Sequence, residues 1–152
     1  SVTGITVFSN SLDVAQAVAR KEGIRLVILG GELDATTGTI AGSLAEANIR
    51  QFWADKAILG ADAVSPDTGL TSRGSITAQT KKAMIECCRE IVVVADHSKL
   101  GRTAPYRVAP VERITTLVTD DKAYERLLND FRSAGVEVFV ASIVCFIELK
   151  GA

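Results

Sequence analysis

The chain has 152 residues, of which 47% are hydrophobic, and its formal net charge at pH 7 is −1. This length and composition suit one folded domain with a substantial core and argue against a disordered chain. The near-neutral charge gives no support for nucleic-acid binding through an overall positive field. No apolar run approaches the roughly 20 residues that span a bilayer, and no signal-peptide pattern is visible. We therefore expect a cytoplasmic protein with no membrane partner.

The cysteine and histidine content bounds the chemistry further. Cys87, Cys88 and Cys145 make an odd count with an adjacent pair, which is a poor disulfide framework and fits cytosolic thiols better. One histidine and no Cys-x-x-Cys spacing argue against a structural zinc site. Neither Gly-x-Gly-x-x-Gly nor a Walker-type motif is present, so a nucleotide-binding domain is the weakest reading. We expect no metal and no cofactor.

The first third of the chain alternates predicted strands and helices. Runs of β-branched and aliphatic residues predict strands, and apolar residues at helical spacing predict helices. The expected elements are a strand at 4–9, a helix from 12 to about 21, a strand at 25–29, a short strand or irregular loop at 32–40, and a helix at 43–53. The strand at 25–29 is continuously apolar, a pattern typical of burial on both faces.

The remainder of the chain continues the alternation. The expected elements up to residue 110 are a strand at 56–59, a polar loop at 60–72, a helix at 76–89, a strand at 91–95 and a connection at 101–110 that contains prolines and could include antiparallel pieces. After it we expect a strand at 114–118, a helix capped by Asp120 or Asp121 and ended by Gly135, a strand at 136–140 and a further strand at 142–149. This alternation predicts an α/β domain, with a mainly parallel open sheet and helices on both faces.

Two polar stretches stand out, each directly after a predicted strand. Gly60–Ser72 contains glycines, a proline, carboxylates and hydroxyls, and we interpret it as too polar for core and too patterned for an idle loop. Asp96–Arg102 reads Asp-His-Ser-Lys-Leu-Gly-Arg. We predict that the two stretches are neighbouring walls of one pocket for a small phosphorylated ligand.

The reason is that ligands of open parallel sheets bind beyond the carboxyl ends of the strands. Four predicted strands end in polar or glycine-rich turns, which would then share one rim: Asn10-Ser11, Gly30-Gly31, Gly60-Ala-Asp62 and Asp96-His-Ser-Lys99. Glycines let a ligand approach the backbone, and free N–H groups at a helix start favour an anion. Lys99 suits a phosphate, and the carboxylates suit sugar hydroxyls.

Each of these residues also has a purely structural interpretation. Asn10-Ser11 caps a helix with or without a ligand, and Gly30-Gly31 makes a tight turn. Asp62 would brace the loop at 60–72. Asp96 and Lys99 would form a surface ion pair of little energetic value. The ligand hypothesis therefore depends on the convergence of several residues.

The order of these motifs resembles the effector-sensing domain of the DeoR/GlpR family of bacterial sugar-metabolism repressors. The resemblance is carried by Leu59-Gly-Ala-Asp-Ala-Val-Ser-Pro-Asp-Thr-Gly-Leu-Thr-Ser72, Val94-Ala-Asp-His-Ser-Lys-Leu-Gly-Arg102, Val7-Phe-Ser-Asn-Ser11, Leu29-Gly-Gly-Glu-Leu33 and Thr39-Ile-Ala-Gly-Ser-Leu-Ala45. It reaches to about Ala141 and implies the fold of ribose-5-phosphate isomerase and its relatives.

The resemblance also implies a function. Residues 1–152 would be a single sensor domain that binds a phosphorylated sugar or polyol as effector. Operator DNA would be bound only by an N-terminal helix-turn-helix domain, which this chain lacks, and family members act as homo-oligomers. The resemblance implies phosphate contacts at Asn10 and Ser11 and sugar contacts at Gly30, Gly31, Asp62, Thr71, Asp96 and Lys99. We also predict Gly69 and His97 as ligand contacts.

One departure from the family pattern concerns the helix after the polar loop. The family commonly has a glutamate there, followed by alanine and later lysine, whereas this chain has Thr77 before Ala78 and Lys81. The alternative function is a sugar-phosphate isomerase or related enzyme, which needs a general base and a group that stabilises an enediolate. Asp62, Asp96 and Lys99 are candidates, but Thr77 removes the obvious glutamate base, and Glu32 is another carboxylate near the predicted rim. We therefore expect a sensor with no catalytic residues.

Overall fold

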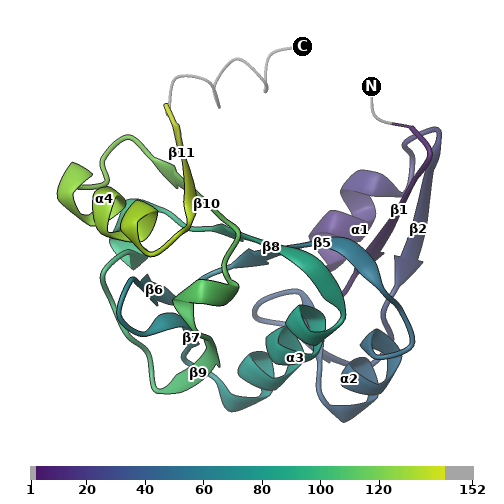
Figure 1. Cartoon of the computed structure of the whole chain (residues 1–152). Coiled ribbons are helices and arrows are strands. Elements are labelled where there is room, and N and C mark those ends of the chain that lie inside the picture. Colours follow the sequence, from purple (N-terminus) through teal and green to yellow (C-terminus); the bar gives the residue numbers. More distant parts are fainter. Residues whose placement is uncertain (1–2, 143–152) are drawn as a thin grey trace. The chain divides into compact units, whose positions relative to one another are not determined.

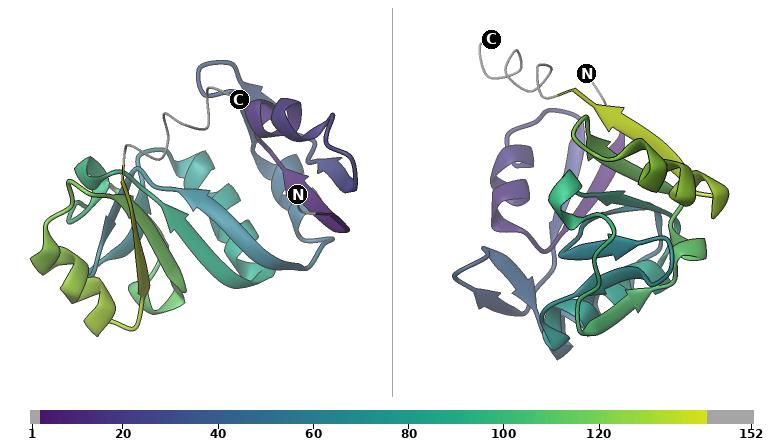
Figure 2. Two further views of the ribbon diagram at one scale, coloured as in Figure 1. Left: turned by 90° about the horizontal axis from the view of Figure 1, so that it is seen from above. Right: turned by 90° about the vertical axis from the view of Figure 1, so that its left-hand side faces the viewer.

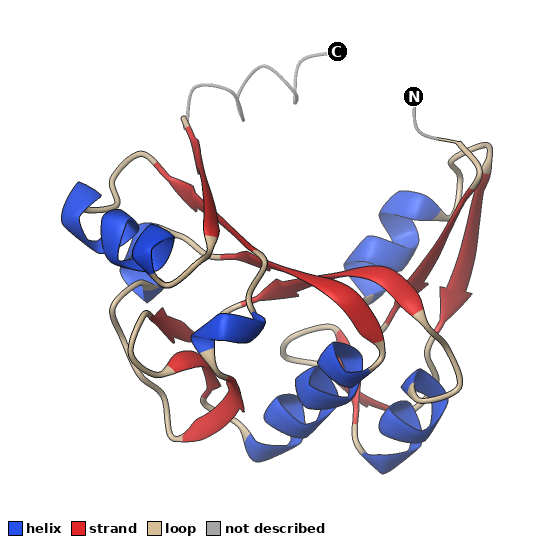
Figure 3. Ribbon diagram, in the orientation of Figure 1, coloured by secondary structure: helices blue, strands red, loops and turns tan. Residues whose placement is uncertain are grey.

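The computed structural model describes residues 3–142, coloured along the sequence in Figure 1 and by secondary structure in Figure 3. By its internal contacts the chain divides into two compact units, Ser1–Phe52 and Trp53–Ala152. The prediction of one sensor domain over the whole chain stays a prediction. No helix among residues 3–142 combines the length and apolar character needed to cross a membrane.

The first unit is built on a parallel strand pair. It contains β1 (Ile5–Ser9), α1 (Leu12–Val18), β2 (Ile24–Ile28), the antiparallel pair β3 (Glu32–Asp34) and β4 (Thr39–Ala41), and α2 (Ser43–Ile49). As predicted, Ser11 caps α1, its hydroxyl accepting a hydrogen bond from the Val14 backbone N–H. The predicted burial of the second strand on both faces is wrong: Ile28 is 54% exposed, because the strand has one partner and packs against α1 on one side.

The second unit contains a four-stranded parallel sheet in the order β11–β10–β8–β5, seen from further directions in Figure 2. Its strands are β5 (Ala54–Gly60), β8 (Cys88–Val94), β10 (Thr116–Asp120) and β11 (Glu137–Ala141). Helices α3 (Ser75–Glu86) and α4 (Glu125–Ser133) flank it. The predicted fold class, an α/β domain with a parallel sheet and helices packed on it, is confirmed.

The stretch 60–72 differs from the prediction of a polar, non-core loop. It forms a hairpin, β6 (Ala63–Ser65) and β7 (Gly69–Ser72), and every residue of both strands is buried. β9 (Tyr106–Ala109) pairs with β7 in the antiparallel sense, so the expected antiparallel piece near the prolines is confirmed. The hairpin is buried because its hydroxyls find hydrogen-bond partners nearby, which removes most of the cost of taking them out of water.

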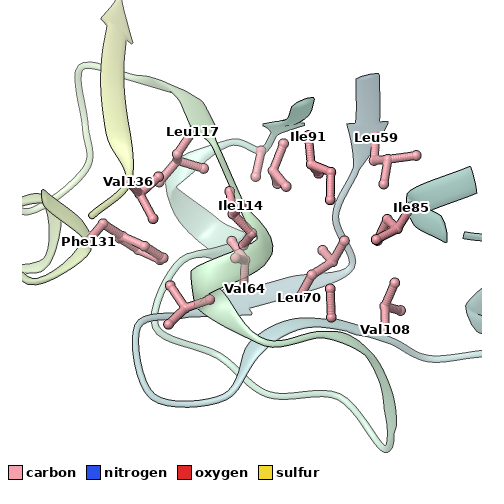
Figure 4. Close-up of a cluster of buried hydrophobic side chains, with 14 of the residues drawn as sticks. Leu59, Val64, Leu70, Ile85, Ile91, Val108, Ile114, Leu117, Phe131 and Val136 are labelled. Carbon is pink, nitrogen blue, oxygen red and sulfur yellow. The ribbon is translucent and has the colours of Figure 1, made fainter. Parts of the chain in front are cut away.

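The core of the second unit lies between this hairpin and the parallel sheet. Figure 4 shows side chains from the sheet, the hairpin and both helices in one cluster, including Leu59, Ile91, Leu117, Val64, Leu70, Ile85 and Phe131. Helices α3 and α4 both contribute to this cluster, so the described helices of this unit pack on one face of the sheet, whereas the sequence analysis predicted helices on both faces. On the other face Ile58, which alternates with Leu59 along β5, is 72% exposed. The strand predicted at 142–149 lies outside the described residues, apart from Ser142.

Candidate functional site

The carboxyl ends of three neighbouring strands of the second unit meet at one edge of the sheet. Gly60 at the end of β5 pairs with Val94 at the end of β8, and Val94 pairs with Val118 near the end of β10. Asp62 and Asp96 lie in the turns that follow β5 and β8, and Asp120 is the last residue of β10. Because the strands are parallel, these turns lie at the same edge, where α/β proteins bind ligands.

The two polar stretches are neighbours, as predicted. Val64 in β6 forms a parallel bridge with Leu100, and its carbonyl accepts a hydrogen bond from the backbone N–H of Gly101 at 2.8 Å. The hydroxyls of Thr68 and Thr103 lie 3.0 Å apart. The hairpin therefore supports the backbone that presents His97 and Lys99.

Asp62 braces the hairpin, as its structural interpretation predicted. Its Oδ2 accepts hydrogen bonds from the Ser72 hydroxyl at 2.6 Å and from the backbone N–H of Arg73 at 3.0 Å. Burial opposes ionisation of this carboxyl, but these hydrogen bonds and the charges of Lys81 and Arg73 outweigh it, so the pKa of Asp62 lies below its ordinary value. Asp62 is therefore an ionised acceptor that the fold holds in place.

Lys81 reaches the same edge from α3. Its Nζ donates to the backbone carbonyl of Gly60, the last residue of β5, at 2.8 Å. Burial lowers the pKa of Lys81, and the negative charge of Asp62 offsets part of that effect. Lys81 was not among the predicted ligand contacts. The sequence feature that could have identified Lys81 is the family pattern in which a lysine follows the position of Thr77.

His97 is held by a residue that the sequence analysis assigned to another role. Its Nδ1 lies 2.9 Å from Oδ1 and 3.0 Å from Oδ2 of Asp120. Oδ2 also accepts the backbone N–H of His97 at 2.8 Å, and Oδ1 accepts that of Lys122 at 2.9 Å. The first of these backbone hydrogen bonds is the main reason that the pKa of Asp120 falls to about 2.

The prediction that Asp120 or Asp121 caps the fourth helix is wrong. Asp120 is the last residue of β10, and α4 begins only at Glu125, with Tyr124 in the capping position. A strand ends and a turn begins at Asp120, so the reasoning that selected Asp62 and Asp96 applied equally to it. The turn places its carboxylate against His97, a contact across 23 residues that no local pattern encodes.

Asp96 and Lys99 belong to a single turn of 3-10 helix, His97–Lys99, that follows β8. Asp96 caps this turn, its Oδ1 accepting the backbone N–H of Ser98 at 2.8 Å. Hydrogen bonding by Ser98 is the largest influence on Asp96 and lowers its pKa, with a smaller contribution from the charge of Lys99. The Lys99 ammonium forms no hydrogen bond or ion pair with any other residue among 3–142.

Gly69 and Thr71, two further predicted contacts, are parts of the buried hairpin. Gly69 has φ +71°, and a Cβ there would collide with the carbonyl oxygen of Ala109 and lie 2.7 Å from the carbonyl carbon of Pro110. The Thr71 hydroxyl donates to the Ala63 carbonyl at 3.3 Å and accepts the Ala104 N–H at 2.8 Å. These contacts give both residues structural roles, and their contact with a ligand stays a prediction.

Three of the four predicted contacts of the first unit lie beside β4. The Asn10 side chain donates to the Ile40 carbonyl at 2.8 Å, and Ser11 bridges to Thr39. Gly31 has φ +154°, and a Cβ there would lie 2.9 Å from the Ala41 carbonyl oxygen. Gly30 has no atom within 4 Å of a Cβ position, which leaves its backbone open. The phosphate role of Asn10 and Ser11, and a rim shared by all four turns, stay predictions.

A hollow of about 610 Å³ opens elsewhere on the second unit, between the hairpin turn and α4. Its lining includes Asp67 and Asp130 and none of the predicted ligand contacts. Two carboxylates repel a phosphate, so we do not assign the effector site to this hollow.

Asp96, His97 and Asp120 also form a possible metal-ligand group, the one such group within residues 3–142. One ligand atom from each lies within 4.8 Å of the others. However, both oxygens of Asp120 accept backbone N–H groups, and His97 Nδ1 faces them. The hydrogen bonds account for the geometry of this cluster, so it is best described as an Asp–His pair beside Asp96.

Comparison with known proteins identifies related regulators. The chain is 39% identical over 117 residues to the transcriptional repressor AccR of Agrobacterium fabrum, covering 76% of this chain and 45% of the relative. It is 33% identical over 118 residues to the glycerol-3-phosphate regulon repressor of Escherichia coli (strain K12), covering 78% and 47%. It is 32% identical over 135 residues to the HTH-type transcriptional repressor GlcR of Bacillus subtilis (strain 168), covering 89% and 52%.

The chain thus spans about half the length of the curated relatives that it matches. The family model described as the DeoR C terminal sensor domain matches residues 1–121, which includes both polar stretches and Asp120. The resemblance predicted from the motifs is therefore confirmed: this chain belongs to the DeoR family of transcriptional repressors and comprises its sensor domain.

Proposed function

We propose that the sensor domain binds a phosphorylated sugar or polyol at the carboxyl edge of the parallel sheet in its second unit. Lys99 contacts the phosphate. Asp96, His97 and the ionised Asp62 contact hydroxyls. Lys81 adds positive charge beside Asp62.

The observation that carries this proposal is the state of Lys99. This ammonium makes no hydrogen bond or ion pair within residues 3–142, so it is available to an anionic ligand, and it lies on a turn that Asp96 and Ser98 hold in shape. The carboxylates of Asp62 and Asp96 and the imidazole of His97 lie at the same sheet edge as Lys99. An unpaired cation beside several hydroxyl acceptors matches a ligand that is anionic at one end and hydroxylated along its length.

We further propose that the domain regulates transcription and does not catalyse a reaction. It acts in the cytoplasm as part of a homo-oligomeric repressor, in which an N-terminal helix-turn-helix domain binds operator DNA. Effector binding changes the affinity for the operator, which requires that the effector bind one state of the assembly more tightly than the other. The names of the three relatives, each a repressor, support this proposal.

A thermal-shift screen tests the proposal. The purified chain is heated with glycerol 3-phosphate, ribose 5-phosphate, glucose 6-phosphate and fructose 6-phosphate, and with each parent compound. A ligand that binds only the folded state raises the unfolding midpoint. We expect one phosphorylated compound to raise the midpoint and its parent to leave the midpoint unchanged.

Variants locate the binding site. Lys99→Ala should abolish the shift. The control is Lys21→Ala, an exposed lysine of the first unit on the segment that enters β2. This variant should keep the shift. Recovery of the ligand unchanged after incubation would exclude the isomerase alternative, and a shift that survives Lys99→Ala would contradict the assigned phosphate contact.

A further inference from the structure

We propose that Asp120 is a positioning residue for effector recognition: it fixes the orientation and tautomer of His97, so that Nε2 faces the effector as a hydrogen-bond acceptor. This inference rests on the proposed function. It assigns a role to a residue outside the predicted contacts, and it specifies which group of the effector His97 recognises.

The first step concerns the carboxylate. Asp120 receives backbone N–H groups on both oxygens, from His97 at 2.8 Å and from Lys122 at 2.9 Å. Its side chain is 16% exposed, so it has little freedom to turn toward solvent. Two backbone amides thus hold the carboxylate in one orientation, and they keep it ionised.

The second step concerns the imidazole. An ionised carboxylate only accepts hydrogen bonds, so the contact of 2.9 Å between Asp120 Oδ1 and His97 Nδ1 requires a proton on Nδ1. In the neutral imidazole the proton is then absent from Nε2, which becomes an acceptor. A carboxylate that fixes the tautomer of an adjacent histidine in this way is a general feature of histidine sites.

The third step concerns what Nε2 faces. The His97 side chain is 42% exposed, and its Nε2 has no hydrogen-bond partner among residues 3–142. His97 lies between Asp96 and Lys99 on the turn that we assign to the effector. An acceptor nitrogen pairs with a donor, so His97 with its proton on Nδ1 and none on Nε2 recognises a hydroxyl of the effector, and Lys99 remains the partner for its phosphate.

The histidine content of the chain makes this inference testable without a ligand. His97 is the only histidine, so nitrogen NMR of the imidazole gives one pair of ring signals. Near pH 9, where an ordinary imidazole is neutral, we expect the protonated nitrogen of the wild-type protein to be Nδ1. In Asp120→Asn, the amide NH₂ can donate to Nδ1, and we expect the population to shift toward the form protonated at Nε2. A wild-type protein protonated at Nε2 would overturn the proposal.

Calorimetry then tests the effector contact, with the phosphorylated compound selected by the thermal-shift screen. Asp120→Asn and His97→Ala should each weaken binding about 10-fold, the size of one lost hydrogen bond. If Asp120 acts through His97, the double variant should bind no more weakly than His97→Ala alone. Additive losses would overturn the positioning role.

Two controls separate the possible failures. The unfolding midpoint of each variant, measured without ligand, shows whether the variant is folded at the temperature of the binding experiment. If Asp120→Asn is unstable, Asp120→Ala provides a second variant. If no compound of the panel binds the wild-type protein, the proposed function fails and the effector contact of Nε2 fails with it. If the compound binds wild type and Asp120→Asn equally, the proposed function stands and the role of Asp120 is wrong.

Discussion

The two polar stretches, Gly60–Ser72 and Asp96–Arg102, are similar in composition and opposite in structural role. The first folds into a hairpin whose strands are entirely buried, and its hydroxyls are hydrogen-bonded within the fold. The second is a mostly exposed turn that leaves Lys99 and one nitrogen of His97 without partners among residues 3–142. Polarity alone therefore does not distinguish a binding site from core. What distinguishes them is whether the polar groups are already satisfied by the protein.

The comparison predicts that substitutions in the hairpin change stability, whereas substitutions in the turn change ligand binding. The largest stability effect should come from Gly69→Ala. An alanine at φ +71° is strained, and its Cβ would overlap the backbone of Ala109 and Pro110. Together these effects should lower the free energy of unfolding by about 3–5 kcal/mol, measured by urea denaturation.

Gly135→Ala is the matched control for Gly69→Ala. Gly135 has φ +90° and nothing within 4 Å of a Cβ position, so only the backbone strain remains. That variant should lose about 1–2 kcal/mol. Equal losses in the two variants would show that the close packing around Gly69 contributes little.

Thr71→Val should have the next largest effect. Valine keeps the shape of threonine but leaves the Ala104 N–H without its acceptor and the Ala63 carbonyl without one of its donors. The expected loss is about 2 kcal/mol in urea denaturation, the cost of an unsatisfied buried group. Thr68→Val removes an exposed hydroxyl contact of the same hairpin and should change stability by less than about 0.5 kcal/mol. A neutral Thr71→Val would mean that the hairpin is not held by this hydroxyl.

The turn at 96–102 is tied to the fold through Asp120 of β10, which holds His97. We expect the stability that this carboxylate provides to depend on pH. Its pKa in the native protein, about 2, lies below the ordinary 3.8. A lowered native pKa means that the ionised carboxylate stabilises the fold above about pH 4, and that this contribution is lost as the pH falls through about 2. Urea denaturation of wild type and Asp120→Asn should therefore show a stability difference that narrows from about pH 5.5 to 2.5. A difference that is constant over this range would contradict the assignment.

The two stretches also show how far the sequence predicts this structure. Periodicity predicted the parallel strands β5, β8, β10 and β11 to within a few residues, because a buried strand needs a continuous apolar run. The hairpin was missed because its burial depends on hydrogen bonds with two residues outside β6 and β7: Ala104, whose backbone N–H donates to Thr71, and Asp62, whose carboxylate accepts from Ser72.

The sequence likewise predicted part of the candidate site and missed residues that reach it from other elements. The rule that ligands gather at the carboxyl edge selected Asp96, His97 and Lys99 from local order alone. Asp120 was assigned to a helix cap, because aspartate before an amphipathic run is a common capping signal. Its contact with His97 spans 23 residues and two strands, and such a partner emerges only when the sheet is assembled. Lys81 likewise reaches Gly60 from a different element.

Lys99→Ala should have the smallest effect on stability, and it therefore tests the comparison most sharply. The ammonium makes no hydrogen bond or ion pair within residues 3–142, so its removal leaves no buried partner unsatisfied. Lys99 is half-buried, and the free energy of unfolding should stay within about 0.5 kcal/mol of wild type, the usual range for a surface residue that makes no such contacts. A loss above about 1 kcal/mol would place Lys99 with the structural residues of the hairpin. Unchanged stability together with lost effector binding would instead show that this turn leaves its cation unpaired for a ligand, whereas the hairpin satisfies its polar groups to support the fold.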